Sequence, residues 1–92
     1  MQVIENRADL EATVVSVRSD DSRPGHRLVS LDVHAVHSVE SYPNLLQETA
    51  GKTVEVVAPD EAAGALAAGS RVRGRARRTG PASIYAESFT RI

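Results

Sequence analysis

Apolar and polar residues alternate from position 26 to position 39, and this pattern limits the possible folds more than any other feature of the chain. One parity is apolar and the other polar, with Val29, Leu31, Val33 and Ala35 on the first and Ser30, Asp32 and His34 on the second. Successive side chains of a β-strand point to opposite faces, so the pattern predicts a strand with one buried face. A chain of 92 residues has room for one small core rather than several. We therefore expect one mainly β domain that spans residues 1–92.

Four further segments have the composition of strands, and turn or helix signals separate them. They are rich in β-branched residues or alternate in polarity, and they cover 10–19, 52–58, 70–78 and 83–91. Pro24 and Gly25 predict a hairpin turn after the first strand. Segment 41–51, with an early proline and a final glycine, fits one or two helical turns. Segment 60–69, which begins with two acids and ends at glycine, predicts a short helix weakened by Gly64. The predicted order is β, β, a helical turn, β, α, β, β.

Five short strands in this order favour a closed sheet, because closure removes the exposed edges. The element order, the entry Gly51-Lys52-Thr53-Val54 into the third strand and the passage 66–74 after the helix resemble the OB-fold over residues 8–92. The resemblance implies a five-stranded OB-like Greek-key barrel with a short helix between strands 3 and 4. Many OB domains bend their first strand at a glycine, which this chain lacks, so we expect a β-bulge to supply the curvature.

Four arginines at every second position are the least expected feature of the sequence. Arg71, Arg73, Arg75 and Arg77 would share one face of the predicted fourth strand, with guanidinium groups about 7 Å apart along it. That interval is near the spacing of successive phosphates, and guanidinium groups recognise phosphate well. Residues 70–92 carry six Lys and Arg against one acid, a net charge of +5, whereas residues 1–69 carry five against eleven, a net charge of −6.

The arginine row predicts a nucleic-acid-binding site. OB domains commonly bind single strands through a basic track combined with aromatic stacking, so the resemblance implies a non-enzymatic binding module that contacts the backbone of single-stranded DNA or RNA. We expect Arg23 and Arg27, beside the first hairpin loop, to form the far wall of the track, and Tyr85 to contribute an aromatic ring. Phe89 is expected in the core.

Two other interpretations stay open. In the first, the arginines form a solvated strand face, paired across the sheet with acids such as Glu11, Glu55 or Glu87. In the second, the protein is an interaction or assembly subunit whose basic C-terminal strand meets an acidic surface of a protein partner or of a second copy in a homodimer. A small-molecule or oligosaccharide binder ranks last, because the sequence has few aromatic residues to stack on sugars.

The sequence offers little for catalysis, metals or cofactors. It contains no cysteine, no glycine-rich phosphate loop and no nucleophile placed with a histidine in a known motif. His34 and His37 are three residues apart, which on a regular strand sends them to opposite faces. We expect no enzymatic activity, metal or cofactor. No apolar stretch approaches the roughly 20 residues of a membrane span, and residues 1–7 lack the features of a secretory signal, so we expect a cytoplasmic protein with no membrane partner.

Overall fold

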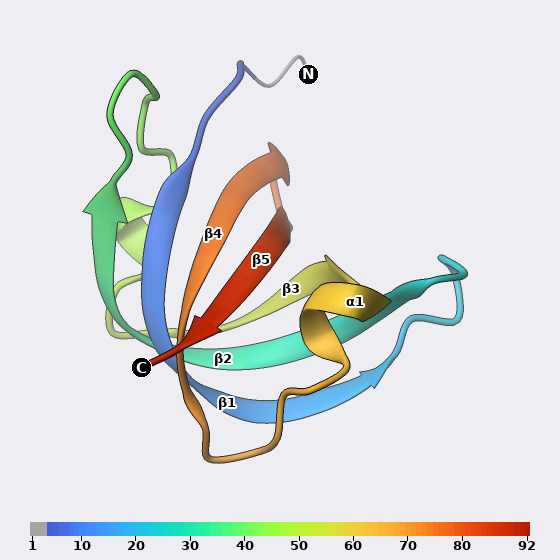
Figure 1. Cartoon of the computed structure of the whole chain (residues 1–92). Coiled ribbons are helices and arrows are strands. Elements are labelled where there is room, and N and C mark those ends of the chain that lie inside the picture. Colours follow the sequence, from blue (N-terminus) through green and yellow to red (C-terminus); the bar gives the residue numbers. More distant parts are fainter. Residues whose placement is uncertain (1–3) are drawn as a thin grey trace.

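The computed structural model describes residues 4–92, and its five strands form one closed barrel with the strand order β1-β2-β3-β5-β4 (Figure 1). The elements are β1 (Ala8–Ser19), β2 (His26–Ser38), the 3-10 turn η1 (Gln47–Thr49), β3 (Thr53–Pro59), α1 (Asp60–Ala63), β4 (Arg71–Gly80) and β5 (Ser83–Arg91). The predicted mainly β fold, with five strands and a short helix between the third and fourth, is confirmed. Residues 1–3, part of the segment interpreted as lacking a secretory signal, lie outside the described range.

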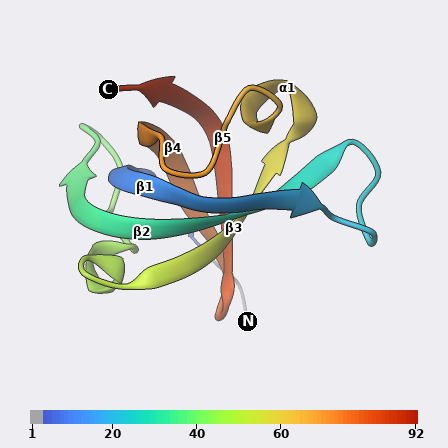
Figure 2. The same cartoon turned by 90° about the horizontal axis from the view of Figure 1, so that it is seen from below.

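Antiparallel pairing joins most neighbouring strands of the barrel. It links β1 to β2, β2 to β3, β1 to β4 and β4 to β5, while one parallel bridge between Val57 and Tyr85 joins β3 to β5 and closes the ring. In the view from below, β5 crosses β1 and β2 steeply (Figure 2). The β1–β4 ladder runs from the pair Ala8–Ala76 to the pair Thr13–Arg71. The arginines of β4 therefore lie beside the first half of β1.

Two β-bulges interrupt the pairing of β1 with β2. Val15 is the extra residue in β1 and His34 is the extra residue in β2, so a bulge replaces the missing glycine in the first strand, as expected. Beyond His34 the side-chain parity changes, so Val36 packs against the core while Ala35 lies opposite Glu11. The predicted core position of Ala35 is wrong, because alternation holds only while the register is unbroken.

Small aliphatic side chains fill most of the barrel interior. The largest of those that are fully buried are Leu10, Val14, Val29, Leu31, Val33, Leu46, Val56 and Val72. Val54 packs against this core, as expected. Val57 is only half-buried, because it lies on the parity opposite to Val56, and its predicted burial is confirmed only in part.

Phe89 extends the core on β5 and packs against Gly74 of β4. A Cβ atom added at Gly74 would lie 2.8 Å from a ring carbon of Phe89, so the ring occupies the space that any other side chain would need. The predicted core role of Phe89 is confirmed. A register shift in the β4–β5 pairing leaves Glu87 as the extra residue between Ala86 and Ser88, and this bulge keeps both Ala86 and Phe89 directed inward.

The helix between β3 and β4 is shorter than the sequence pattern predicts. It spans Asp60–Ala63, and the N–H of Gly64 donates to the carbonyl of Asp60 at its end. The predicted continuation to Gly69 is wrong, since a helix this short is marginal and the chain must turn back toward β4, which it does with Gly69 at φ +88°. No helix within residues 4–92 is long and apolar enough to cross a bilayer.

Candidate functional site

The arginine row occupies the outer face of β4. Arg71, Arg73 and Arg75 are exposed, whereas the three residues that alternate with them, Val72, Gly74 and Ala76, are buried. The fourth member, Arg77, is half-buried. The burial alternates as the spacing predicts, because β4 is paired on both sides and its inner face closes the core. The row is therefore displayed on a rigid wall of the barrel rather than on a loop.

Acidic side chains of the neighbouring strand β1 lie along the same face. Asp9 accepts hydrogen bonds from Nε of Arg75 at 3.0 Å and from a terminal nitrogen of Arg75 at 3.3 Å, and its other ion pair, with Nε of Arg73, spans 3.9 Å. The hydrogen bonds that Arg75 donates to Asp9 raise the pKa of the Arg75 guanidinium, which stays charged. Glu11 lies opposite Arg73 in the ladder but contacts His37. The interpretation of a paired strand face thus holds in part, with Asp9 as the partner that the sequence analysis did not name.

A chain of stacked and ion-paired side chains continues the row beyond Arg75. The guanidinium carbon of Arg77 lies 4.9 Å from the ring centroid of Tyr85, which faces the ring of His26 at 5.9 Å. Glu87 pairs with a terminal nitrogen of Arg77 at 3.6 Å and with Nε of Arg7 at 3.2 Å. Tyr85 therefore points to the outer surface, a question that the sequence pattern did not decide.

A second cation–π contact lies at the other end of this group of side chains. The guanidinium carbon of Arg7 is 4.7 Å from the ring centroid of Tyr42. A cation over an aromatic face is attracted by the ring quadrupole and is held in one orientation. Arg7 and Arg77, which both pair with Glu87, therefore each stack on a tyrosine ring as well.

Arg23 and Arg27 do not join the row. Arg27 lies opposite the buried Ala58 in the β2–β3 ladder, and its Nε pairs with Asp60 of α1 at 3.3 Å. Arg23 is exposed in the turn between β1 and β2, at the tip of a hairpin that extends away from β4 (Figures 1 and 2). The expected far wall of the track is not present in this arrangement, because the parity of Arg27 directs it to the end of the barrel.

The first residues of the described chain bind to β4 through Asn6. Asn6 is buried; its side-chain amide donates to the carbonyls of Ile4 and Arg78 at 2.9 and 3.0 Å, and its side-chain oxygen accepts from the N–H of Arg78 at 2.7 Å. These bonds continue the β1–β4 pairing and bring Arg7 beside Arg77. The side chain of Arg78 turns the other way, where it donates to the carbonyl of Leu45 at 3.1 Å and pairs with Glu48.

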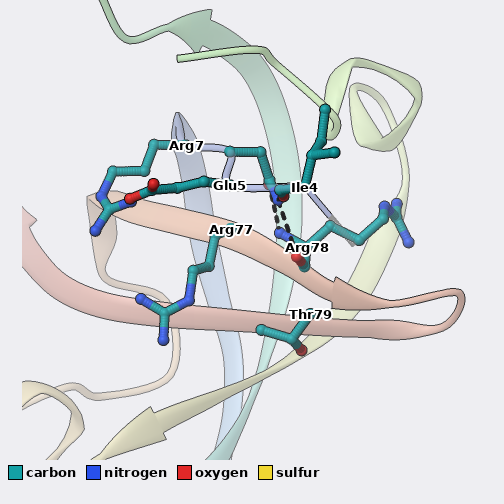
Figure 3. A pocket seen from close by; sticks show the side chains of 7 residues that line it. Ile4, Glu5, Arg7, Arg77, Arg78 and Thr79 are labelled. Carbon is teal, nitrogen blue, oxygen red and sulfur yellow. Dashed lines mark hydrogen bonds and ion pairs between the residues drawn. The ribbon is translucent and has the colours of Figure 1, made fainter. Parts of the chain in front are cut away.

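Arg7 and Arg77 line a surface cavity of about 330 Å³ between the N-terminal segment and β4. Their guanidinium groups project to the same side of the chain, while that of Arg78 projects to the opposite side (Figure 3). The other polar residues that line the cavity are Glu5, Asn6, Arg78 and Thr79. Sequence analysis missed Arg7 and Asn6 as members of this region, because they meet β4 only through contacts over 70 residues or more. It did name Glu87 among the acids that could pair with the arginines, and the ion pair with Arg77 confirms that interpretation.

The histidines do not have the arrangement that their spacing predicts. The His34 bulge places His34 and His37 on the same outer face, where Nε2 of His34 lies 2.8 Å from the hydroxyl oxygen of Thr13 and His37 contacts Glu11. The prediction that His34 and His37 lie on opposite faces is wrong, because the bulge at His34 changes the side-chain parity, as it does for Ala35. Among residues 4–92, no group of three or more histidine, aspartate and glutamate side chains is arranged to hold a metal ion.

Replacing His37 by alanine should raise the pKa of Glu11. The hydrogen bond with His37 is the largest cause of a lowered Glu11 pKa, and the charges of Arg73 and Arg71 add to it. Because the folded-state pKa is the lower one, this interaction stabilises the fold above the ordinary glutamate value of about 4.3 and is lost as the pH falls through the lowered pKa. NMR titration of the Glu11 carboxyl carbon measures the shift, with Arg71→Ala expected to change it less. An unchanged midpoint in His37→Ala contradicts the prediction.

Comparison with known proteins returns no relative. No protein-family model matches the chain, and no curated protein or solved structure matches it either.

Proposed function

We propose that this protein is an OB-like module that binds the backbone of single-stranded nucleic acid through the outer face of β4. The observation that carries the proposal is the exposure of Arg71, Arg73 and Arg75 at alternate positions of a strand whose other face is buried. A strand rises about 3.3 Å per residue, so these guanidinium groups repeat at roughly the interval of successive phosphates along a single strand. Binding requires no rearrangement of the barrel.

The topology supports the OB assignment. A five-stranded barrel with the ring order β1-β2-β3-β5-β4 and a short helix after β3 fits the general description of that fold. OB domains often bind on the face of strands 2 and 3. Here that face exposes Asp32 and Glu55, whose charges repel phosphate. We therefore assign the binding face to β4.

The ion pairs along β4 are compatible with phosphate binding. The side chains of Arg73 and Arg75 remain 46% and 43% exposed while they contact Asp9. Exposed ion pairs contribute little free energy, with typical values of about 0 to 1 kcal/mol. Each guanidinium also has five N–H donors, so a phosphate can be bound without complete loss of the contact with Asp9. The paired acids lower the affinity of the row but leave its donors accessible.

Fluorescence anisotropy with single- and double-stranded oligonucleotides tests the proposal. We expect single-stranded binding whose logarithmic association constant falls linearly with the logarithm of salt concentration, with a slope of about −0.7 for each phosphate contacted. Three exposed arginines predict a slope near −2 by that rule. Binding that is absent, or that does not change with salt, contradicts the proposal.

The alternative of a charge-driven assembly subunit has less support in the folded protein than in the sequence. Acids of the acidic part, residues 1–69, already pair with arginines of the basic part, residues 70–92: Asp9 pairs with Arg73 and Arg75, and Glu48 pairs with Arg78. Sedimentation without nucleic acid, at low and high salt, remains the measurement that would favour it: a dimer that dissociates as salt is added supports assembly, and a monomer under both conditions counts against it.

A further inference from the structure

We propose that Glu87 is a built-in competitor for phosphate, whose carboxylate occupies one end of the arginine row and keeps Arg7 and Arg77 out of the binding track. The inference rests on the proposed function and extends it: the ligand is the phosphodiester backbone of the same single strand. Without the charge of Glu87, the track would run from Arg71 past Arg75 to this second pair of guanidinium groups.

The contacts of Glu87 are those that a phosphate would make. One carboxylate oxygen lies 3.2 Å from Nε of Arg7, and the other lies 3.6 Å from a terminal nitrogen of Arg77. Carboxylate and phosphate oxygens are both strong acceptors for guanidinium donors. Each of the two arginines is also held over a tyrosine ring. Two oriented cations that meet at one anion form a site into which another anion fits if the first one is removed.

The fold places Glu87 at this position through a bulge. Arg75 pairs with Ser88 and Ala76 pairs with Ala86, so Glu87 is the residue without a partner in the ladder. The bulge puts Glu87 on the outer face beside Arg77, although Ala86 before it points inward. A regular ladder would leave only one of the two residues 87 and 88 on that face.

A surface cavity adjoins the two arginines that pair with Glu87, although Glu87 itself does not line it. Arg7 and Arg77 line the cavity of about 330 Å³, together with Thr79. Their guanidinium groups project to the same side, opposite to that of Arg78 (Figure 3). Glu5 is the acid in this wall, and its side chain is 74% exposed with a longer contact of 3.6 Å to Arg7. Glu87, at 33% exposure, is the better-held competitor.

Glu87→Gln tests the inference against Glu55→Gln, which removes the same charge on β3, where Glu55 pairs with Arg18 at 2.8 Å. We expect Glu87→Gln to bind a single-stranded oligonucleotide several-fold more tightly at low salt. The salt slope should become steeper by about 0.7 to 1.4, which corresponds to one or two added phosphate contacts. Glu55→Gln should change the affinity by less than about twofold, and thermal unfolding of both variants checks that they are folded.

A double variant tests whether the added affinity depends on Arg77. Adding Arg77→Ala to Glu87→Gln should remove most of the added affinity, because the new contact depends on that guanidinium. If the wild-type protein binds but Glu87→Gln behaves like Glu55→Gln, the inference is overturned while the proposed function stands. If neither the wild-type protein nor Glu87→Gln binds, the proposed function fails and the inference fails with it.

Discussion

Replacing Arg73 and Arg75 together by alanine should weaken binding of single-stranded oligonucleotides about tenfold or more at low salt, and should make the salt slope shallower by about 1.4. The two residues are the central members of the row, and both guanidinium groups are exposed on the outer face of β4. Each lost phosphate contact removes about 0.7 from the slope for single strands. Anisotropy titrations at several salt concentrations measure both quantities.

Two controls separate lost contacts from other effects of the substitution. Arg18→Ala with Lys52→Ala removes the same number of positive charges away from β4, and its salt slope should stay close to the wild-type value. Adding Asp9→Asn to the Arg73 and Arg75 substitutions removes the carboxylate that loses its partners. If this triple variant regains wild-type affinity, repulsion by Asp9 rather than loss of contacts explains the result, and the role of the row is contradicted.

Gly74→Ala should destabilise the fold by about 1 to 3 kcal/mol, the usual cost of overpacking a core. The added Cβ would lie 2.8 and 2.9 Å from two ring carbons of Phe89, so the ring must move out of its position against the core. A small domain has a total stability of only about 5 to 15 kcal/mol. Urea unfolding followed by circular dichroism measures the change as a lower midpoint with an unchanged slope.

Gly80→Ala is the matched control, because it lies in the same strand and its added Cβ would meet Ser83 at ordinary contact distances of 3.6 and 3.7 Å. Its effect should stay within about 0.5 kcal/mol. In a Phe89→Ala background, Gly74→Ala should cost little, since the clashing ring is gone. An equal loss for Gly74→Ala with and without the ring would show that the contact with Phe89 is not the cause.

Local patterns predicted the elements of this protein well. The alternation in β2 held up to Val33, and the spacing of the arginines correctly predicted one exposed face of β4. Both predictions depend only on the two-residue period of a strand. The alternation failed in β2 where a bulge adds His34. No glycine or other residue type in that segment marks the bulge in advance.

The candidate site could be predicted only in part, because its other members come from distant parts of the chain. Arg7 reaches Arg77 through the hydrogen bonds of Asn6 to Arg78, across 72 positions of sequence. We expected Arg27 near the arginine row because it lies beside the first hairpin loop, but in the barrel its side chain pairs with Asp60. Neither outcome follows from neighbouring residues alone.

By itself the sequence determined the mainly β class, the order of the elements and the presence of a basic strand face, because each follows from steric and periodic rules that act within about ten residues. Only the tertiary structure decided which charges meet. The pairing of β1 with β4 sets Asp9 beside Arg73 and Arg75, and a bulge in β5 sets Glu87 between Arg7 and Arg77. Electrostatic interactions depend on distance in space, and the pairing of strands far apart in the chain sets that distance.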